Sequence, residues 1–278
     1  MPSTLCFPDS EKSCFACCPP IRPPEYTHAD YENIIKRTLR ENSKDYNPDE
    51  KDLKPITGFS CWALGYVDAE YKKIGCLLHP QVNNGRDMRY RIDYGVKCMR
   101  ESCTEEVVFS MMGEREKHFW LSLTAGMNSF EYSNRKTNLL FKMLNWGSSL
   151  LAKISDNDNE KYHSKKEFLK RYPFFDTGLL PRGHSFPVNH IIRTKSADLL
   201  AGIEFINKYE YFSKILSEKI SSNFKMPHDG IFVHKLGINR EFSDYIRLTL
   251  GVRKAEITFV NELYDFVLNE LDLFCKKI

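Results

Sequence analysis

The sequence has almost no excess of charge of either sign. Its 40 Lys and Arg residues are balanced by 37 Asp and Glu residues, which leaves a formal net charge of +3. A nucleic-acid scaffold needs dense blocks of Lys and Arg that neutralise successive phosphates, and the sequence has none. The basic segment 161–171 is interpreted as a solvated helix face. The composition therefore gives no strong nucleic-acid signal.

Long apolar runs are also missing. The most apolar interior window, residues 138–152, contains Lys142, Asn145 and two serines, and it is too short to span a bilayer. Residues 1–12 have no basic region followed by an apolar one, so we expect no secretory signal. These absences favour a soluble, cytoplasmic protein with no membrane segment, in which thiols stay reduced.

Sequence motifs of several enzyme classes are absent as well. No G-x-G-x-x-G, G-x-x-x-x-G-K-[ST], H-E-x-x-H or G-x-S-x-G pattern occurs. Dinucleotide folds, P-loops, zincins and hydrolase elbows therefore have no motif support. His184 and His190 lie in a Pro- and Gly-rich segment, 171–190, which we interpret as a loop with surface histidines.

Cysteine, in contrast, is concentrated at one end of the chain. Eight of the nine cysteines occur in the first 103 residues, where an even distribution would place about three. These eight are Cys6, Cys14, Cys17, Cys18, Cys61, Cys76, Cys98 and Cys103. The asymmetry divides the chain into two parts, residues 1–103 and residues 104–278.

Most of these thiols occur in close pairs. Cys14 and Cys17 form C-x2-C, Cys76 and His79 form C-x2-H, and Cys98 and Cys103 form C-x4-C, while Cys18 and Cys61 stand apart. Two ligands separated by two residues can both point at one ion, because a tight turn brings their side chains together. The predicted metal ligands are Cys14, Cys17, Cys18, Cys61, Cys76, His79, Cys98 and Cys103. Cys6 and Cys275 are interpreted as bystanders.

Eight ligands are enough for two closed four-ligand zinc sites, or for one iron–sulfur cluster with ligands to spare. The identity of the metal stays open. Ordinary buried thiols, disulfides, or a redox dithiol among Cys14, Cys17 and Cys18 are the alternatives. Arg86, Arg89 and Arg91 lie between the pairs. They would either meet an anionic ligand or offset thiolate charge at the metal, and we favour the second.

The order of these residues resembles a family of zinc- or iron-chelating cysteine-cluster proteins, a broad group that includes the flagellin lysine N-methylases. The shared order is C-x2-C-C, a cysteine followed closely by a leucine, G-C and a closing cysteine pair. The matching positions are Cys14, Cys17, Cys18, Cys61, Leu64, Gly75, Cys76, Cys98 and Cys103. The match spans residues 13–103, and it lacks one thiol of the family's usual opening and its R-P-x-x-C motif. The resemblance implies a metal-chelating cysteine domain.

The rest of the chain is helical in pattern. Three apolar stripes with helical spacing begin at Leu139, Leu199 and Ile257 and are interpreted as core faces. A helix is predicted to start with Thr104 as its N-cap, and GIFVHKLG (230–237) predicts a short strand. In the first part, a helix is predicted over residues 27–42.

We therefore predict a mainly α protein, in which a loop-rich cysteine metal-binding module (residues 1–103) precedes a mainly α-helical domain (residues 104–278). The expected function is binding of zinc or an iron–sulfur cluster at a structural site. A metal that binds only the folded chain contributes about 10 kcal/mol or more to folding, which suits a module with few apolar stripes. The alternative is an iron–sulfur enzyme that uses the cluster in redox chemistry or methyl transfer.

Overall fold

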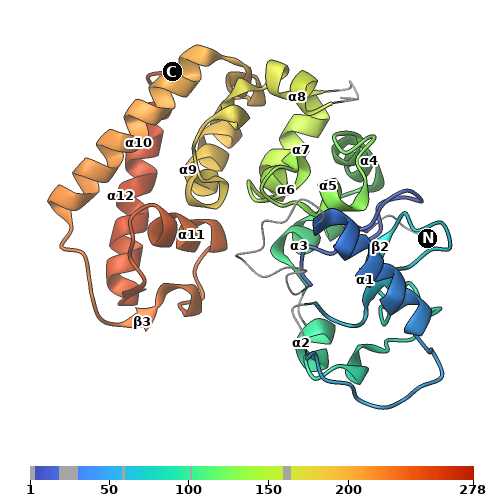
Figure 1. Ribbon diagram of the computed structural model, residues 1–278. Helices are drawn as coiled ribbons and strands as arrows, with labels where there is room; N and C mark the ends of the chain where they lie inside the picture. The colour runs from blue at the N-terminus through green and yellow to red at the C-terminus, as the bar shows by residue number, and fades with distance from the viewer. Residues whose placement is uncertain (1–3, 19–30, 58–59, 101, 159–163) are drawn as a thin grey trace. The chain divides into compact units, whose positions relative to one another are not determined.

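The computed structural model describes residues 4–18, 31–57, 60–100, 102–158 and 164–278. Helices hold 56% of the described residues and strands 5%, which confirms a mainly α protein. The chain divides into two compact units (Figure 1). Unit 1 comprises Met1–Met111 and Thr124–Phe141, and unit 2 comprises Met112–Leu123 and Lys142–Ile278. No helix within the described ranges is both long and apolar enough to cross a membrane.

Unit 1 combines short helices with one small hairpin. Its elements are α1 (Tyr31–Asp45), β1 (Leu64–Tyr66), β2 (Ile74–Cys76), the 3-10 helix η1 (Arg89–Arg91), α2 (Gly95–Arg100), α3 (Thr104–Ser110) and α5 (Ser129–Ser133). Strands β1 and β2 pair antiparallel, with Leu64 opposite Cys76 and Tyr66 opposite Ile74. Helix α6 (Leu139–Leu144) begins in unit 1 and ends in unit 2.

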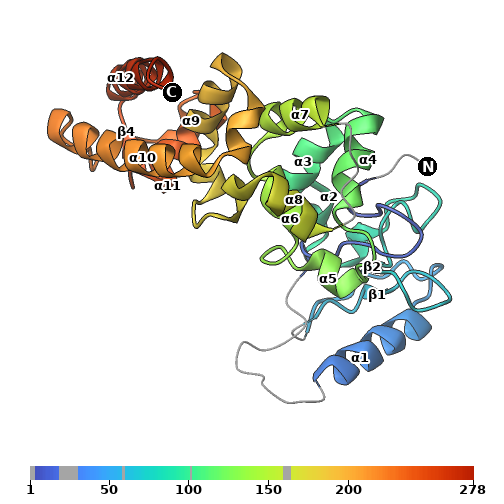
Figure 2. The same ribbon diagram turned by 90° about the horizontal axis from the view of Figure 1, so that it is seen from above.

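Helix α1 packs against strand β1 at the edge of unit 1 (Figure 2). Ile35 and Leu39 of the predicted apolar face are buried. Beside this apolar contact, the hydroxyl of Ser43 on α1 accepts a hydrogen bond from the amide of Tyr66 on β1 at 2.6 Å. The predicted helix is therefore confirmed from Tyr31 onward. Its predicted beginning at Thr27 lies outside the described residues.

Unit 2 contains most of the long helices. Its elements are α4 (Glu114–Ser122), α7 (Ser148–Asn157), α8 (Lys165–Arg171), η2 (Pro173–Asp176), α9 (Pro181–Thr194), η3 (Ala197–Ala201), α10 (Ile203–Asn223), β3 (Ile231–Phe232), η4 (Val233–Lys235), α11 (Arg240–Leu248), β4 (Lys254–Ala255) and α12 (Ile257–Cys275). Strands β3 and β4 pair antiparallel. The strand predicted within 230–237 is therefore confirmed for two residues, after which the chain turns into η4.

The predicted apolar stripes are largely buried, with one shift in α10. Every predicted stripe residue from Leu139 to Ile154 is buried, although the stripe is split between α6 and α7. In the stripe predicted from Leu199, Leu200, Tyr209 and Leu216 are buried as expected, whereas Ile203 is 69% exposed. Phe205 and Ile220, which lie outside the predicted stripe, complete the buried face of α10. This face meets α12 and the aromatic cluster of η2, which the sequence spacing alone does not specify.

The prediction of a loop over 171–190 is wrong, because most of this segment is helical. Pro173 and Pro181 stand in the first turns of η2 and α9, where proline needs no amide hydrogen. Pro187 lies inside α9 and cannot donate to the carbonyl of Gly183. The hydroxyl of Thr249 donates to that carbonyl at 2.6 Å instead. This contact also requires Gly183, because a Cβ there would lie 2.9 Å from the Thr249 Oγ1.

We expect Thr249→Val to lower the free energy of unfolding by about 1–3 kcal/mol, because it removes the donor to a half-buried carbonyl. Thr249→Ser keeps the donor and should cost clearly less. The measurement is denaturant unfolding of both variants. In a Pro187→Ala background, the new amide can donate to Gly183, so the cost of Thr249→Val should shrink. An equal cost in both backgrounds would contradict this explanation of the helical proline.

The two histidines of this segment are helical residues of α9 with partners, not loop residues. The ring of His184 lies against Tyr209, with Nδ1 3.1 Å from the phenol oxygen. Burial lowers the pKa of His184 to about 4. His190 is closer to the surface, and its Nε2 lies 2.8 Å from Oδ1 of Asp272 on α12. Both side chains therefore serve the packing of α9 in unit 2.

The lowered pKa of His184 predicts a loss of stability in acid. The unfolded chain binds a proton near pH 6.5 and the folded chain only near pH 4, so protonation favours unfolding. The free energy of unfolding should fall by up to about 3 kcal/mol as the pH falls through this window, and level off below it. Denaturant unfolding across this range should show a shallower slope for His184→Asn than for the unchanged protein. Identical slopes would exclude His184 as the source.

Candidate metal centre

Four cysteines of unit 1 gather around the hairpin, and we call them the hairpin sulfur group. They are Cys18, Cys61, Cys76 and Cys98. All four belong to or pack against one apolar cluster that includes Leu39, Leu64 and Met88. Cys61 is buried in this cluster, and the other three are half-buried. Segments far apart in the sequence therefore bring one cysteine each to the same place.

The hairpin explains how two of these cysteines meet. Strand pairing sets Leu64 opposite Cys76. A turn then places Cys61 beside this pair, because the amide of Leu64 donates to the carbonyl of Cys61 at 3.0 Å. Cys98 is brought in by helix α2, and its carbonyl accepts a hydrogen bond from the guanidinium of Arg89 at 2.5 Å.

The other four cysteines lie where the N-terminal segment meets helix α3, and we call them the N-terminal sulfur group. They are Cys6, Cys14, Cys17 and Cys103. The amide of Cys14 donates to the carbonyl of Cys6 at 2.8 Å. Glu106 of α3 connects the two ends of the group. Its carboxylate accepts from the amide of Leu5 at 2.9 Å, and its own amide donates to the sulfur of Cys103 at 3.3 Å.

Cys103 therefore takes the position that the sequence assigns to Thr104. It is the N-cap of α3, with extended backbone and its sulfur on the amide three residues later. The prediction of Thr104 as the cap is wrong by one residue, because Ser and Thr are the usual capping side chains and a sulfur cap has no such signature. The capping bond holds the Cys103 sulfur at the first turn of the helix.

Helix α5 braces the cysteine-bearing N-terminal segment. The hydroxyl of Ser129 accepts from the amides of Ser13 at 3.2 Å and Ile74 at 3.4 Å, and it donates to the carbonyl of Lys72 at 2.9 Å. Ser133 accepts from the amide of Phe15 at 3.0 Å. The residues on either side of Cys14 are thus fixed. Sequence reasoning missed both serines, because a serine in a short helix carries no signal of a contact over a hundred residues away.

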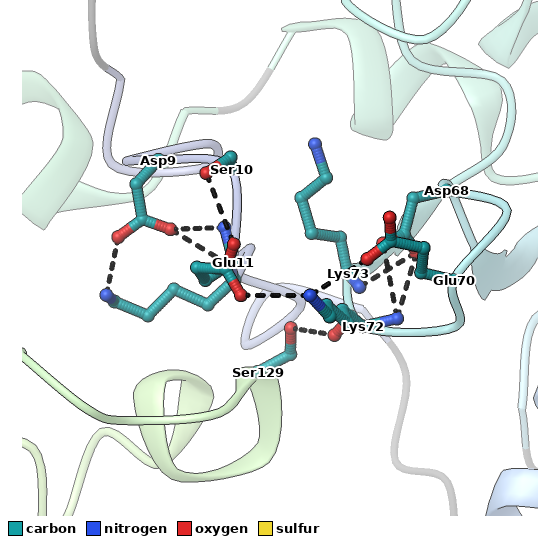
Figure 3. Close-up of polar contacts among 9 residues, drawn as sticks. Asp9, Ser10, Glu11, Asp68, Glu70, Lys72, Lys73 and Ser129 are labelled. Atoms are coloured by element: carbon teal, nitrogen blue, oxygen red, sulfur yellow. Dashed lines mark hydrogen bonds and ion pairs between the residues drawn. The ribbon is translucent and has the colours of Figure 1, made fainter.

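Figure 3 shows the polar network next to this brace. The carboxylate of Asp68 accepts from the amides of Lys72 and Lys73, at 3.0 Å each, and so closes the turn of the hairpin. The ammonium of Lys72 lies 3.3 Å from Glu11 and 2.8 Å from Glu70. A groove of about 650 Å³ lies beside this network. Since Lys72 on its rim is already paired with acids, the network itself serves to join the N-terminal segment to the hairpin.

Burial is the main influence on most of the thiols. It raises the pKa of Cys14 and of Cys76 to about 12, and it raises the pKa of Cys6, Cys61 and Cys103 as well. Neighbouring thiolate charge raises these values further. For all five thiols, the cysteine charges that act most strongly come from the same sulfur group. These five thiols are therefore electrostatic neighbours within their groups, and burial favours their protonated form.

The two groups meet at the adjacent residues Cys17 and Cys18. A hydrogen bond between their side chains lowers the pKa of Cys17 and raises that of Cys18. Arginine charge acts in the same direction on Cys17, from Arg135 and Arg89. Cys17 is also the exposed member of the set. These influences favour the thiolate form of Cys17.

The three predicted arginines have different surroundings. Arg89 lies beside the hairpin sulfur group, pairs with Asp87 at 2.7 Å, and lowers the pKa of Cys76 as one of the smaller influences after burial. Arg91 is fully buried, and its guanidinium contacts Glu50 at 3.2 Å. Arg86 is exposed. The basic side chain beside the N-terminal sulfur group is Arg135, which forms an ion pair with Glu105 and was missed because it lies outside the cysteine-rich sequence.

The eighth predicted ligand, His79, differs from the cysteines in its contacts. Its ring packs on Phe7 with centroids 5.4 Å apart, and its Nδ1 accepts a hydrogen bond from the amide of Gln81 at 3.2 Å. Burial lowers the pKa of His79 to about 4, and no cysteine charge is among its main influences. Cys6, which the sequence analysis interprets as a bystander, belongs to the N-terminal sulfur group. Cys275 is buried in α12 of unit 2.

In the described part of the chain, no three His, Cys, Asp or Glu side chains are arranged around a common point as ligands are around an ion. The nine cysteines, all of them described, form no disulfide bond. Rotation about a single side-chain bond moves a cysteine sulfur by about 3 Å. In each sulfur group the cysteines are neighbours, but their sulfur atoms do not surround a common point.

Comparison of the chain with family models, with curated proteins and with solved structures finds no match.

The brace formed by Ser129 predicts a specific loss of stability. Ser129→Ala leaves two buried amides and one carbonyl without their partner, so the free energy of unfolding should fall by about 1–3 kcal/mol. Hydrogen exchange at the amides of Ser13 and Ile74 should become faster. Ser110→Ala is the matched control, because its hydroxyl is exposed and contacts only a carbonyl of its own helix. Equal losses from the two variants would contradict the role of Ser129.

Proposed function

We propose that unit 1 is a loop-rich metal-binding module whose cysteines chelate zinc or an iron–sulfur cluster, and that the metal is structural. The observation that carries this proposal is that eight of the nine cysteines lie in one unit, four of them in or against one apolar cluster. Reduced thiols at such a density have a common use as soft ligands for zinc or iron.

The energetics of unit 1 support a structural role. Its hairpin has three residues in each strand, and helices α2 and α5 have six and five residues. A metal that binds only the folded unit would add its binding energy to the free energy of folding. The raised pKa values of the buried thiols fit this role. Loss of their protons requires a cation that replaces them, and a bound divalent ion supplies it.

The sequence resemblance to zinc- or iron-chelating cysteine-cluster proteins supports the same proposal for residues 13–103. A second candidate is an iron–sulfur enzyme in which the cluster takes part in redox chemistry or methyl transfer. The exposure of Cys17 favours it, because a reactive cluster needs one accessible side. A closed zinc site would leave no such position open.

Elemental analysis and the absorption spectrum of anaerobically purified protein test this proposal. We expect either stoichiometric zinc in a colourless protein, or iron with a charge-transfer band near about 400 nm. Zinc supports the structural site, and the iron band favours the enzyme candidate. Protein made under metal-replete, anaerobic conditions that contains neither metal would refute both.

Substitution of one proposed ligand should also unfold unit 1. We expect Cys76→Ser to lose metal and to become susceptible to proteolysis between residues 31 and 111. Cys275→Ser is the matched control, since Cys275 is buried but lies in unit 2. Limited proteolysis followed by mass spectrometry locates the cleavage sites. Equal metal content and equal cleavage of the two variants would contradict a ligand role for Cys76.

A further inference from the structure

Unit 2 carries an exposed group of apolar and basic side chains, which we call the β3–β4 patch. Its members are Ile231, Phe232, His234, Lys235, Arg253 and Lys254. Figure 1 shows β3 at the end of unit 2 where α12 begins. We infer that this patch docks unit 2 onto the surface of a membrane that contains anionic phospholipids. The inference is independent of the metal-binding function proposed for unit 1.

The apolar half of the patch is the whole of strand β3. This strand consists of Ile231 and Phe232, which are 52% and 44% exposed. Successive residues of a strand point to opposite faces of a sheet. Both faces of the two-stranded sheet are therefore uncovered at this strand. Single exposed apolar residues are common on protein surfaces, but here two in succession stand on a paired strand.

The local fold fixes this exposure. Val233, the next residue, is fully buried, and its amide donates to the carbonyl of Arg253 at 3.0 Å. Gly230, the preceding residue, has a φ of +116°, and a Cβ there would lie 2.6 Å from the carbonyl carbon of Ala255. The strand is therefore held at both ends, with its two apolar side chains outside.

Cationic side chains surround the ring of Phe232. The ammonium groups of Lys254 and Lys235 lie 5.0 and 5.7 Å from the ring centre. In the described part of the chain, neither lysine forms an ion pair with a carboxylate, and neither does the exposed Arg253. Three cations next to an apolar ring are therefore available to an anionic partner.

Two exposed acids, Asp229 and Glu256, flank the patch in the sequence, and within the described residues neither is paired with one of its cations. They leave only a small local excess of positive charge. Attraction to a membrane is therefore short-ranged, because salt screens charges that lie more than about 10 Å apart. The apolar side chains must enter the membrane surface for the patch to bind well.

An anionic bilayer surface suits both halves of the patch. Apolar side chains insert at the boundary between headgroups and acyl chains, while lysine ammonium groups extend to the phosphates. A single-stranded nucleic acid fits less well, because its bases stack on open aromatic faces. The ammonium of Lys254 and the ring of His234, whose centre is 5.6 Å away, already lie against Phe232. Ile231 offers no ring for stacking.

Co-sedimentation of the full chain with vesicles tests the inference. We expect binding to vesicles of equal parts phosphatidylserine and phosphatidylcholine, and much weaker binding to phosphatidylcholine alone. Lys235→Gln and Lys254→Gln should each weaken binding about fivefold, because each removes one cation from the anionic surface. Absence of binding to either kind of vesicle would overturn the inference.

The matched control removes the same charge elsewhere in unit 2. Lys214→Gln on α10 and Lys277→Gln beyond the far end of α12 both replace exposed lysines outside the patch, and they should change the affinity little. Losses equal to those of Lys235→Gln and Lys254→Gln would show that the charge of the whole chain attracts the vesicles. That result would overturn the assignment to the patch.

Phe232→Ser tests the apolar half of the patch. It should lower the affinity for the phosphatidylserine vesicles about tenfold, because the ring no longer leaves water on binding. Tyr211→Ser is the matched control, since Tyr211 on α10 is 69% exposed and lies outside the patch. Equal affinities of Phe232→Ser and Tyr211→Ser would overturn the inserted role of Phe232.

Insertion is also measured directly with Phe232→Trp, which keeps an aromatic ring at an exposed position. On addition of the phosphatidylserine vesicles its emission should shift to shorter wavelength, and brominated acyl chains should quench it, relative to the unchanged protein. An unshifted emission in sedimented protein would overturn insertion. Binding of a uridine oligonucleotide that Phe232→Ser abolishes, without vesicle binding, would assign the patch to single-stranded nucleic acid instead. Metal analysis of the same samples tests the proposed function separately.

Discussion

The structure of unit 1 depends on the burial of thiols that are uncharged only as long as they keep their protons. A thiolate buried in an apolar cluster is unfavourable unless a cation compensates it, which is why burial raises the pKa of Cys14 and Cys76 so far. In the proposed metal-bound state, the cation would take the place of these protons and compensate the thiolates. The hydrogen bonds of unit 1 described above stabilise this arrangement, because they fix the backbone next to the cysteines.

Those hydrogen bonds come from parts of the chain that no cysteine motif contains. The hydroxyls of Ser129 and Ser133 bind amides on either side of Cys14, and Glu106 ties the N-terminal segment to the capped end of α3. Each contact spans more than a hundred residues of sequence. The compact unit therefore includes residues 124–141, although the asymmetry of cysteine content alone places a division after residue 103.

Unit 2 shows where sequence patterns succeed and where they do not. The stripe from Leu139 to Ile154 is buried as its spacing predicts, because helical periodicity reports directly on which face meets the core. The segment with Pro181 and Pro187 was interpreted as a loop on the basis of residue type. It is a helix because one proline stands in the first turn and Thr249 replaces the hydrogen bond lost at the other.

The sequence by itself determined the helical character of the protein and the concentration of cysteines at one end, since both depend on composition and local spacing. Only the tertiary structure decided which sulfurs are neighbours. Cys6 lies near Cys103, and Cys18 packs against the same apolar cluster as Cys61, Cys76 and Cys98. The physical reason is that grouping depends on long-range hydrogen bonds and strand pairing, and these are absent from any spacing between neighbouring residues.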